Sequence, residues 1–241
     1  MARYIANGSP HWVSWGTGEY DPIEFLSSLD WLMRRRLSGV ILNLFAGSNN
    51  PVKELSEALA VFREVYSDDA TRDRDTIVVE VCSGRLAPVA LLTALFIKRV
   101  EGWAIDTRDM DPRLRELSER LGGKLRLFPG VDVHSPKFEE VLRRARERAS
   151  YLIVVAIHSC RTLAVRILDV FKRVSGDRLL LDPCCAKPSW AKKVVGVEIH
   201  GYWDWVYALW SYATHVLNLP ARVFIAKGML SEANAVIEVR C

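Results

Sequence analysis

The sequence has few cysteines, no one-sided charge and no long apolar run. Its five cysteines include no Cys-x-x-Cys pair, which argues against a disulfide-stapled scaffold. The longest helix-like apolar stretch, residues 86–97, falls short of the roughly 20 residues that span a bilayer. The N-terminal segment MARYIANGSPHW lacks the apolar core of a secretory signal. We therefore expect a soluble, cytoplasmic protein with no membrane contact.

Charges of the two signs nearly balance. Lysine and arginine total 33, aspartate and glutamate total 29, and the net charge is +4. Most of the basic residues are arginines, which suit bidentate phosphate contacts but also build ion-pair networks in heat-stable proteins. A nucleic-acid partner is therefore allowed but not required, and either a monomer or a homodimer is compatible with the sequence.

Strand-like and helix-like segments alternate from Thr76 onward. The apolar runs are nearly continuous, as in strands that are covered on both faces. This pattern predicts an α/β fold with a seven-stranded, mostly parallel, Rossmann-like sheet and helices on both faces. The glycine-containing connection between the last two strands fits an antiparallel hairpin. Strands are expected near 76–81, 101–106, 124–128, 151–157, 178–182, 220–227 and 235–240, and helices near 86–98, 111–121, 136–149, 161–174 and 201–217.

Residues 1–75 are predicted to form a mainly helical N-terminal extension before the domain at 76–241. An aromatic arm covers residues 1–20, and a helix over 22–36 follows Asp21 as its cap. Another helix starts at Pro51. The segment 39–47 between them fits either a strand or the end of a helix.

Residues 76–109 combine a strand, a small-residue turn, a helix and a second strand. Glu80 lies near the end of the first strand, Gly84 lies in the turn, and Asp106 closes the second strand. Such βαβ units hold nucleotide-like cofactors at the carboxyl ends of their strands. The motif G-x-G-x-x-G is absent, so a dinucleotide cofactor is the weaker interpretation. Acids at strand ends also cap the following helix in many proteins.

The seven strands and the acids of the first two resemble the class I S-adenosylmethionine-dependent methyltransferases over about residues 76–241. Gly84 matches a family glycine, whereas Cys82 and Leu86 stand where glycines are usual. The resemblance implies S-adenosyl-L-methionine as the cofactor, with Asp106 accepting from its ribose hydroxyls and Asp132 near its adenine. The implied cofactor contacts are Glu80, Cys82, Ser83, Gly84, Asp106, Thr107, Asp132, Val133 and His158.

A second motif combines His-x-Cys at 158–160 with the pair Cys184-Cys185 after the next strand. It resembles a methyltransferase branch that includes the tRNA acceptor-stem 2′-O-methyltransferases. Arg161 stands where that branch has glycine, and Ala186 where it commonly has histidine. The resemblance implies a tRNA-like RNA substrate and a role in tRNA modification. The implied substrate contacts are Cys160, Cys184, Cys185, Lys187 and Trp190, and Lys187, Lys192 and Lys193 are candidate phosphate ligands.

His158 is suited to general-base catalysis, because an imidazole accepts a proton near neutral pH. Asp182 is the second predicted catalytic residue, either orienting the histidine or taking the proton itself. His158, Cys160, Cys184 and Cys185 also include enough ligands for a zinc ion. Adjacent residues of an extended chain point to opposite faces, so we expect buried, packed cysteines and no metal site.

Three functions are compatible with these patterns. An RNA methyltransferase is favoured by the strand-end acids and the paired histidine and cysteine motifs. A catalytically inactive, methyltransferase-like binding protein would account for the replaced glycines. A small-molecule methyltransferase would have an aromatic-walled pocket without a basic rim, and the aromatic segment 200–218 fits either core packing or base stacking.

Overall fold

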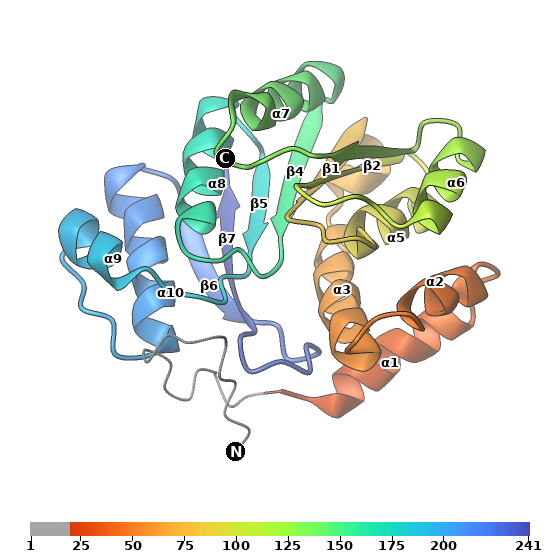
Figure 1. Cartoon of the computed structure of the whole chain (residues 1–241), viewed down its shortest axis with the longest axis horizontal. Helices are drawn as coiled ribbons and strands as arrows, with labels where there is room; N and C mark the ends of the chain where they lie inside the picture. The colour runs from red at the N-terminus through yellow and green to blue at the C-terminus, as the bar shows by residue number, and fades with distance from the viewer. Residues whose placement is uncertain (1–19) are drawn as a thin grey trace.

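A computed structural model describes residues 20–241, and the predicted arm at 1–19 lies outside the described residues. Helices precede the sheet and then alternate with its strands (Figure 1). The first helices are α1 (Pro22–Met33), α2 (Ser38–Phe45), α3 (Pro51–Tyr66) and α4 (Ala70–Asp73). The later helices are α5 (Pro88–Phe96), α6 (Pro112–Arg120), α7 (Pro136–Arg148), α8 (Thr162–Arg173), α9 (Pro188–Val195) and α10 (Tyr202–Ser211), which continues into a π-helical turn, η1 (Tyr212–Val216).

The seven strands form one sheet in the order β3-β2-β1-β4-β5-β7-β6. They are β1 (Thr76–Val81), β2 (Val100–Asp106), β3 (Leu125–Pro129), β4 (Tyr151–Ala156), β5 (Arg178–Leu181), β6 (Ala221–Ile225) and β7 (Ala235–Arg240). Strands β1 to β5 pair with one another in parallel, while β7 pairs antiparallel with β5 and β6. The predicted α/β fold, its seven strands and the terminal hairpin are confirmed.

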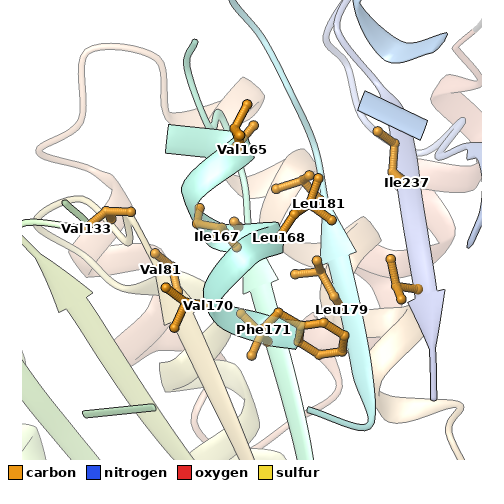
Figure 2. Close-up of a cluster of buried hydrophobic side chains, with 14 of the residues drawn as sticks. Val81, Val133, Val165, Ile167, Leu168, Val170, Phe171, Leu179, Leu181 and Ile237 are labelled. Atoms are coloured by element: carbon orange, nitrogen blue, oxygen red, sulfur yellow. The ribbon is translucent and has the colours of Figure 1, made fainter. Parts of the chain in front are cut away.

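Alternation along each strand places a separate apolar cluster on each face of the sheet. In β1, Val79 and Val81 belong to the cluster under α7, α8 and α10, whereas Val78 belongs to the cluster under α1, α2, α3 and α5. Figure 2 shows the first cluster, in which Phe171 of α8 lies close to Leu179 of β5. Both faces are covered, which explains the near-continuous apolar runs in the sequence.

Three local predictions needed correction. The ambiguous segment 39–47 contains helix α2, and α9 was not predicted although Pro188 stands at its first position. The predicted aromatic helix at 201–217 changes from α to π geometry at Tyr212. Within residues 20–241, no helix has the length and apolarity needed to cross a bilayer.

A buried arginine joins α3 to the sheet. Arg178 of β5 is 1% exposed and donates from Nε to Glu238 of β7 at 2.7 Å. Its Nη1 donates to the backbone oxygen of Glu64 at 2.7 Å and to Asp68 at 3.0 Å. A charge this deep is tolerated only when its partners are present, so the network fixes the C-terminal end of α3 against β5.

Close packing of α5 on β2 makes Gly102 essential for the fold. A Cβ atom at Gly102 would lie 2.0 Å from the backbone oxygen of Ala90. Since the obstacle is backbone, we expect Gly102→Ala to lower the free energy of unfolding by about 1–3 kcal/mol or more, measured by urea denaturation. Gly39→Ala is the matched control: it meets nothing within 4 Å in α2 and should stabilise the protein by up to about 1 kcal/mol. Equal stability of the two variants would contradict this packing.

Candidate functional site

A cavity of about 650 Å³ opens at the carboxyl ends of β1, β2 and β4. Every predicted cofactor contact lines it, although these residues follow four different strands. They are Glu80, Cys82, Ser83, Gly84, Asp106, Thr107, Asp132, Val133 and His158. The opposite wall comes from α3 and the loop before it, including Ser48, Asn49, Lys53 and Glu57. The parallel topology therefore assembles the predicted residues, and α3 completes their enclosure.

The turn after β1 keeps a backbone shape that favours glycine. Cys82 has φ of 56° and Gly84 has φ of 65°, both in the left-handed region. A side chain at such a position costs conformational energy that glycine avoids. Leu86 does not share this conformation, and the neighbouring Ala87 has φ of 43° instead. The turn thus keeps a backbone conformation that suits glycine at Cys82, although the residue is not glycine.

Asp106 is fixed at the cavity wall by the turn that faces it. The residue is 6% exposed, and its Oδ2 accepts from the backbone N–H of Gly84 at 2.8 Å. Its Oδ1 accepts from the backbone N–H of Arg108 at 2.8 Å and from that arginine's Nε at 3.1 Å. The Arg108 side chain is 65% exposed. A carboxylate has about four acceptor positions, so these three contacts leave Asp106 one position for a ligand hydroxyl, and a ligand that displaces the exposed Arg108 side chain would gain a second.

Glu80 combines a place in the cavity wall with a structural task. Its Oε2 accepts from the backbone N–H of Ala90 at 2.8 Å, in the first turn of α5. Burial raises the pKa of Glu80 to about 8, although hydrogen bonds from the backbone of Ala90 and Val89 oppose the rise. Glu80 therefore anchors the helix that follows the cofactor turn.

His158 meets a pair of charged residues from α3. Its Nε2 lies 2.9 Å from Oε2 of Glu57 and 3.0 Å from Nζ of Lys53. The lysine and glutamate also form an ion pair at 2.7 Å. Burial disfavours the charged imidazole, but the Glu57 hydrogen bond and the nearby Asp182 outweigh it and raise the pKa of His158. The same contacts lower the pKa of Glu57 against its own burial.

Asp182 does not line the cavity, although it lies near His158, which does. Its carboxyl oxygens are buried and have no hydrogen-bond partner among the described residues. Burial raises the pKa of Asp182 to about 7, so the group keeps its proton in mildly acidic solution, where an exposed aspartate would release it. The structure brings Glu57, rather than Asp182, into hydrogen-bonding contact with His158.

The predicted substrate contacts lie outside the cavity lining, in the loops after β4 and β5 and, for Trp190, in helix α9. Cys160 and Cys184 bring their sulfurs to 2.7 Å, and the sulfurs of Cys184 and Cys185 are 3.6 Å apart. The expectation that the adjacent cysteines point to opposite faces is wrong, because the chain bends at Cys185 instead of staying extended. Trp190 packs edge-on against Trp205 and Tyr212, while Lys187 is exposed.

Sequence reasoning missed the α3 side of the site. Lys53 and Glu57 are four residues apart on a helix, a spacing that ordinarily indicates an exposed surface pair. The Glu57 side chain is nevertheless only 3% exposed. The one available signal is that α3 is apolar on several sides, which predicts a helix covered by other elements.

The charges of the cavity fit S-adenosyl-L-methionine, whose sulfur is positively charged. The buried groups in the wall are mainly carboxyls, namely Glu57, Glu80 and Asp106. The cationic side chains Arg85 and Arg108 lie exposed toward the mouth. Carboxyl oxygens inside the cavity suit a ligand whose enclosed part carries hydroxyl groups or a positive charge, since these oxygens accept hydrogen bonds and, when ionised, attract a cation.

Comparison with known proteins agrees with this geometry. A profile described as "Methyltransferase domain" matches residues 51–188 and so includes α3. No curated protein matches the chain. Solved structures with similar folds include an O-methyltransferase family protein from Burkholderia thailandensis, with 12% identity, coverage of 90% of this chain and 68% of the other, and a TM-score of 0.39.

Two further solved structures have the same kind of likeness. The mitomycin 7-O-methyltransferase MmcR has 15% identity, coverage of 90% and 67%, and a TM-score of 0.42. A cyclopropane-fatty-acyl-phospholipid synthase-like protein from Lactobacillus casei has 10% identity, coverage of 84% and 98%, and a TM-score of 0.42. The family profile, which covers more than half of the chain, decides the assignment: the protein belongs to the methyltransferase-domain family and is a methyltransferase that uses S-adenosyl-L-methionine.

Proposed function

We propose that this enzyme methylates RNA of a tRNA-like kind, with His158 accepting a proton from the methylated group. The observation that carries the proposal is that one cavity joins Asp106, the turn at 82–84 and His158. When bound, S-adenosyl-L-methionine supplies a methyl group activated by a positively charged sulfur. The residues of this chain have to orient that group, exclude water and receive the proton.

Asp106 is the proposed ribose ligand. A vicinal diol needs two acceptors at one place, and the carboxylate is held rigidly by the backbone N–H groups of Gly84 and Arg108. The turn at 82–84 brings backbone close to the proposed methionine portion, while Asp132 and Val133 line the side proposed for adenine. Such preorganised contacts contribute to catalysis by fixing the orientation of the reacting groups.

Glu57 is the proposed partner that orients His158. If Nε2 of His158 carries a proton and donates it to Glu57, Nδ1 is the nitrogen that is left to accept a proton. That proton comes from the substrate group that receives the methyl. The carboxylate then stabilises the imidazolium that forms, as a buried acid beside a catalytic histidine does in other enzymes. Lys53 neutralises the Glu57 carboxylate through their 2.7 Å ion pair, which limits how strongly the histidine binds its proton.

Exposed cations near the cavity support a polyanionic substrate. Arg85 lies in the cavity wall, is exposed, and forms no ion pair among the described residues. Lys187 and Lys193 are exposed in the neighbouring segment after β5. Such groups can pair with phosphates of an RNA strand while its reactive nucleotide enters the cavity.

Asp106→Asn tests the cofactor assignment. The amide has one acceptor oxygen where the carboxylate has two, and it carries no charge. Because a hydrogen bond to a charged group contributes about 1.5–3 kcal/mol, we expect affinity for S-adenosyl-L-methionine to fall about tenfold or more in calorimetry. Asp109→Asn, an exposed position paired with Arg115, is the control. Unchanged affinity in a folded Asp106→Asn protein would refute the ribose role.

Glu57→Gln tests the proton acceptor. His158 is active as a base only when neutral, so the rate should rise with pH through its pKa. Removing the Glu57 charge leaves burial to lower that pKa, and the acid limb of the pH–rate profile should move to lower pH. The maximal rate should fall, because the imidazolium loses its partner. Glu116→Gln on the exposed surface of α6 is the control. An acid limb that stays in place would contradict the assignment.

Methyl transfer to bulk tRNA tests the substrate class. With methyl-labelled cofactor, we expect label in RNA that nuclease treatment releases. Arg85→Glu should weaken RNA binding and flatten its salt dependence by about one unit of slope for each lost phosphate contact. Lys172→Glu, at the far end of α8, should leave both unchanged. Label that enters only small molecules would replace the RNA proposal while leaving the cofactor site intact.

A further inference from the structure

Three cysteines from two loops converge beside the cavity. Cys160 lies between β4 and α8, while Cys184 and Cys185 lie between β5 and α9. Their sulfur atoms all lie within 4.8 Å of one another. All three residues are half-buried, and none of them belongs to the cavity lining. The cluster is therefore a feature separate from the cofactor site.

Backbone hydrogen bonds hold these two loops together on both sides of Cys160. The N–H of Ser159 donates to the oxygen of Asp182 at 3.1 Å, and the N–H of Arg161 donates to the oxygen of Cys185 at 2.7 Å. Arg161 has φ of 53° and ψ of −125°, a conformation that is close to glycine-only. Strain of this kind persists only where surrounding contacts enforce it, and it is concentrated at functional sites.

Simple packing and a disulfide each explain the cluster incompletely. Buried packing would not require a strained loop to direct Cys160 at two other thiols. A disulfide would use Cys160 and Cys184 and leave Cys185 without a role. Three thiols around one point are instead the ligand set that soft metal ions prefer, because thiolate sulfur is a soft donor.

We propose that Cys160, Cys184 and Cys185 bind one zinc ion through three thiolates, with a fourth position open to water or a substrate atom. No other described His, Cys, Asp or Glu belongs to the group, and zinc with three protein ligands and an open position is a known arrangement. Each thiol loses its proton to solvent as its sulfur binds the metal. The proposal does not depend on the substrate class.

The distances allow this coordination with a small movement. Sulfurs bound at 2.3 Å to one tetrahedral zinc lie about 3.8 Å apart. The Cys184 and Cys185 sulfurs, at 3.6 Å, already match this spacing. The Cys160 and Cys184 sulfurs, at 2.7 Å, would separate by about 1 Å, which a half-buried side chain can accommodate by a change of rotamer.

Metal analysis of the full chain is the direct experiment. Reduced protein equilibrated with zinc and then desalted should retain one zinc per chain by elemental analysis. Cys185→Ser and Cys160→Ser should weaken zinc binding more than tenfold in a chelator competition. Cys241→Ser, an exposed thiol outside the cluster, is the matched control and should bind like the parent.

A second measurement avoids dependence on variants that fail to fold. Zinc should protect three of the five thiols of the parent protein from alkylation, and peptide mapping should identify them as those of the cluster. Zinc titration should release protons. Reduced protein that retains no zinc and shows no protection would overturn the proposal. A Cys160–Cys184 disulfide in protein that binds no zinc after reduction would do the same and would favour a redox role.

Discussion

Helix α3 is fixed to the sheet at both ends, and the site depends on that double attachment. Near its C-terminal end, the buried Arg178 binds the Glu64 backbone and joins α3 to β5. Near its N-terminal end, Lys53 and Glu57 meet His158, which follows β4. Removing one partner from such a buried network leaves a charge without compensation. These contacts hold the helix where it forms one wall of the cavity.

The turn at residues 82–84 keeps a backbone conformation that suits glycine, although only one of its residues is glycine. Cys82 takes a left-handed conformation that glycine would adopt without strain, and Gly84 keeps its own. Arg161, at the other motif, also has a positive φ, of 53°. The surrounding hydrogen bonds enforce these conformations, so the replaced glycines are compatible with an intact site and with the enzyme's membership of its family.

Charge is arranged in layers around the cavity. Carboxyl groups lie in its buried wall, and arginines lie at its exposed mouth. Burial raises the pKa of Glu80 and of Asp182, so these two acids are protonated over a range in which surface acids are charged. Glu57 differs from these two acids, because its contacts with His158 and Lys53 lower its pKa despite its burial. A cationic partner thus distinguishes Glu57 from Glu80 and Asp182.

The sequence by itself determined the sheet and the carboxyl-end positions of the residues predicted to contact the cofactor. Nearly continuous apolar runs of strand length predict the strands, because both faces of the sheet are covered. Parallel strands end at the same edge, so residues such as Asp106 and His158 had to meet once the strand order was set. The strand order alone predicts that these residues lie close together, without knowledge of any side-chain contact. The structure confirms that they line one cavity.

Only the tertiary structure decided which groups touch. The partner of His158 is Glu57, 101 residues earlier in the chain, and a surface-like helical spacing concealed it. Cys184 and Cys185 turn toward Cys160 because their loop bends, whereas the sequence predicted an extended segment. Contacts of this kind depend on how helices dock and loops turn in three dimensions, and a one-dimensional pattern does not record either.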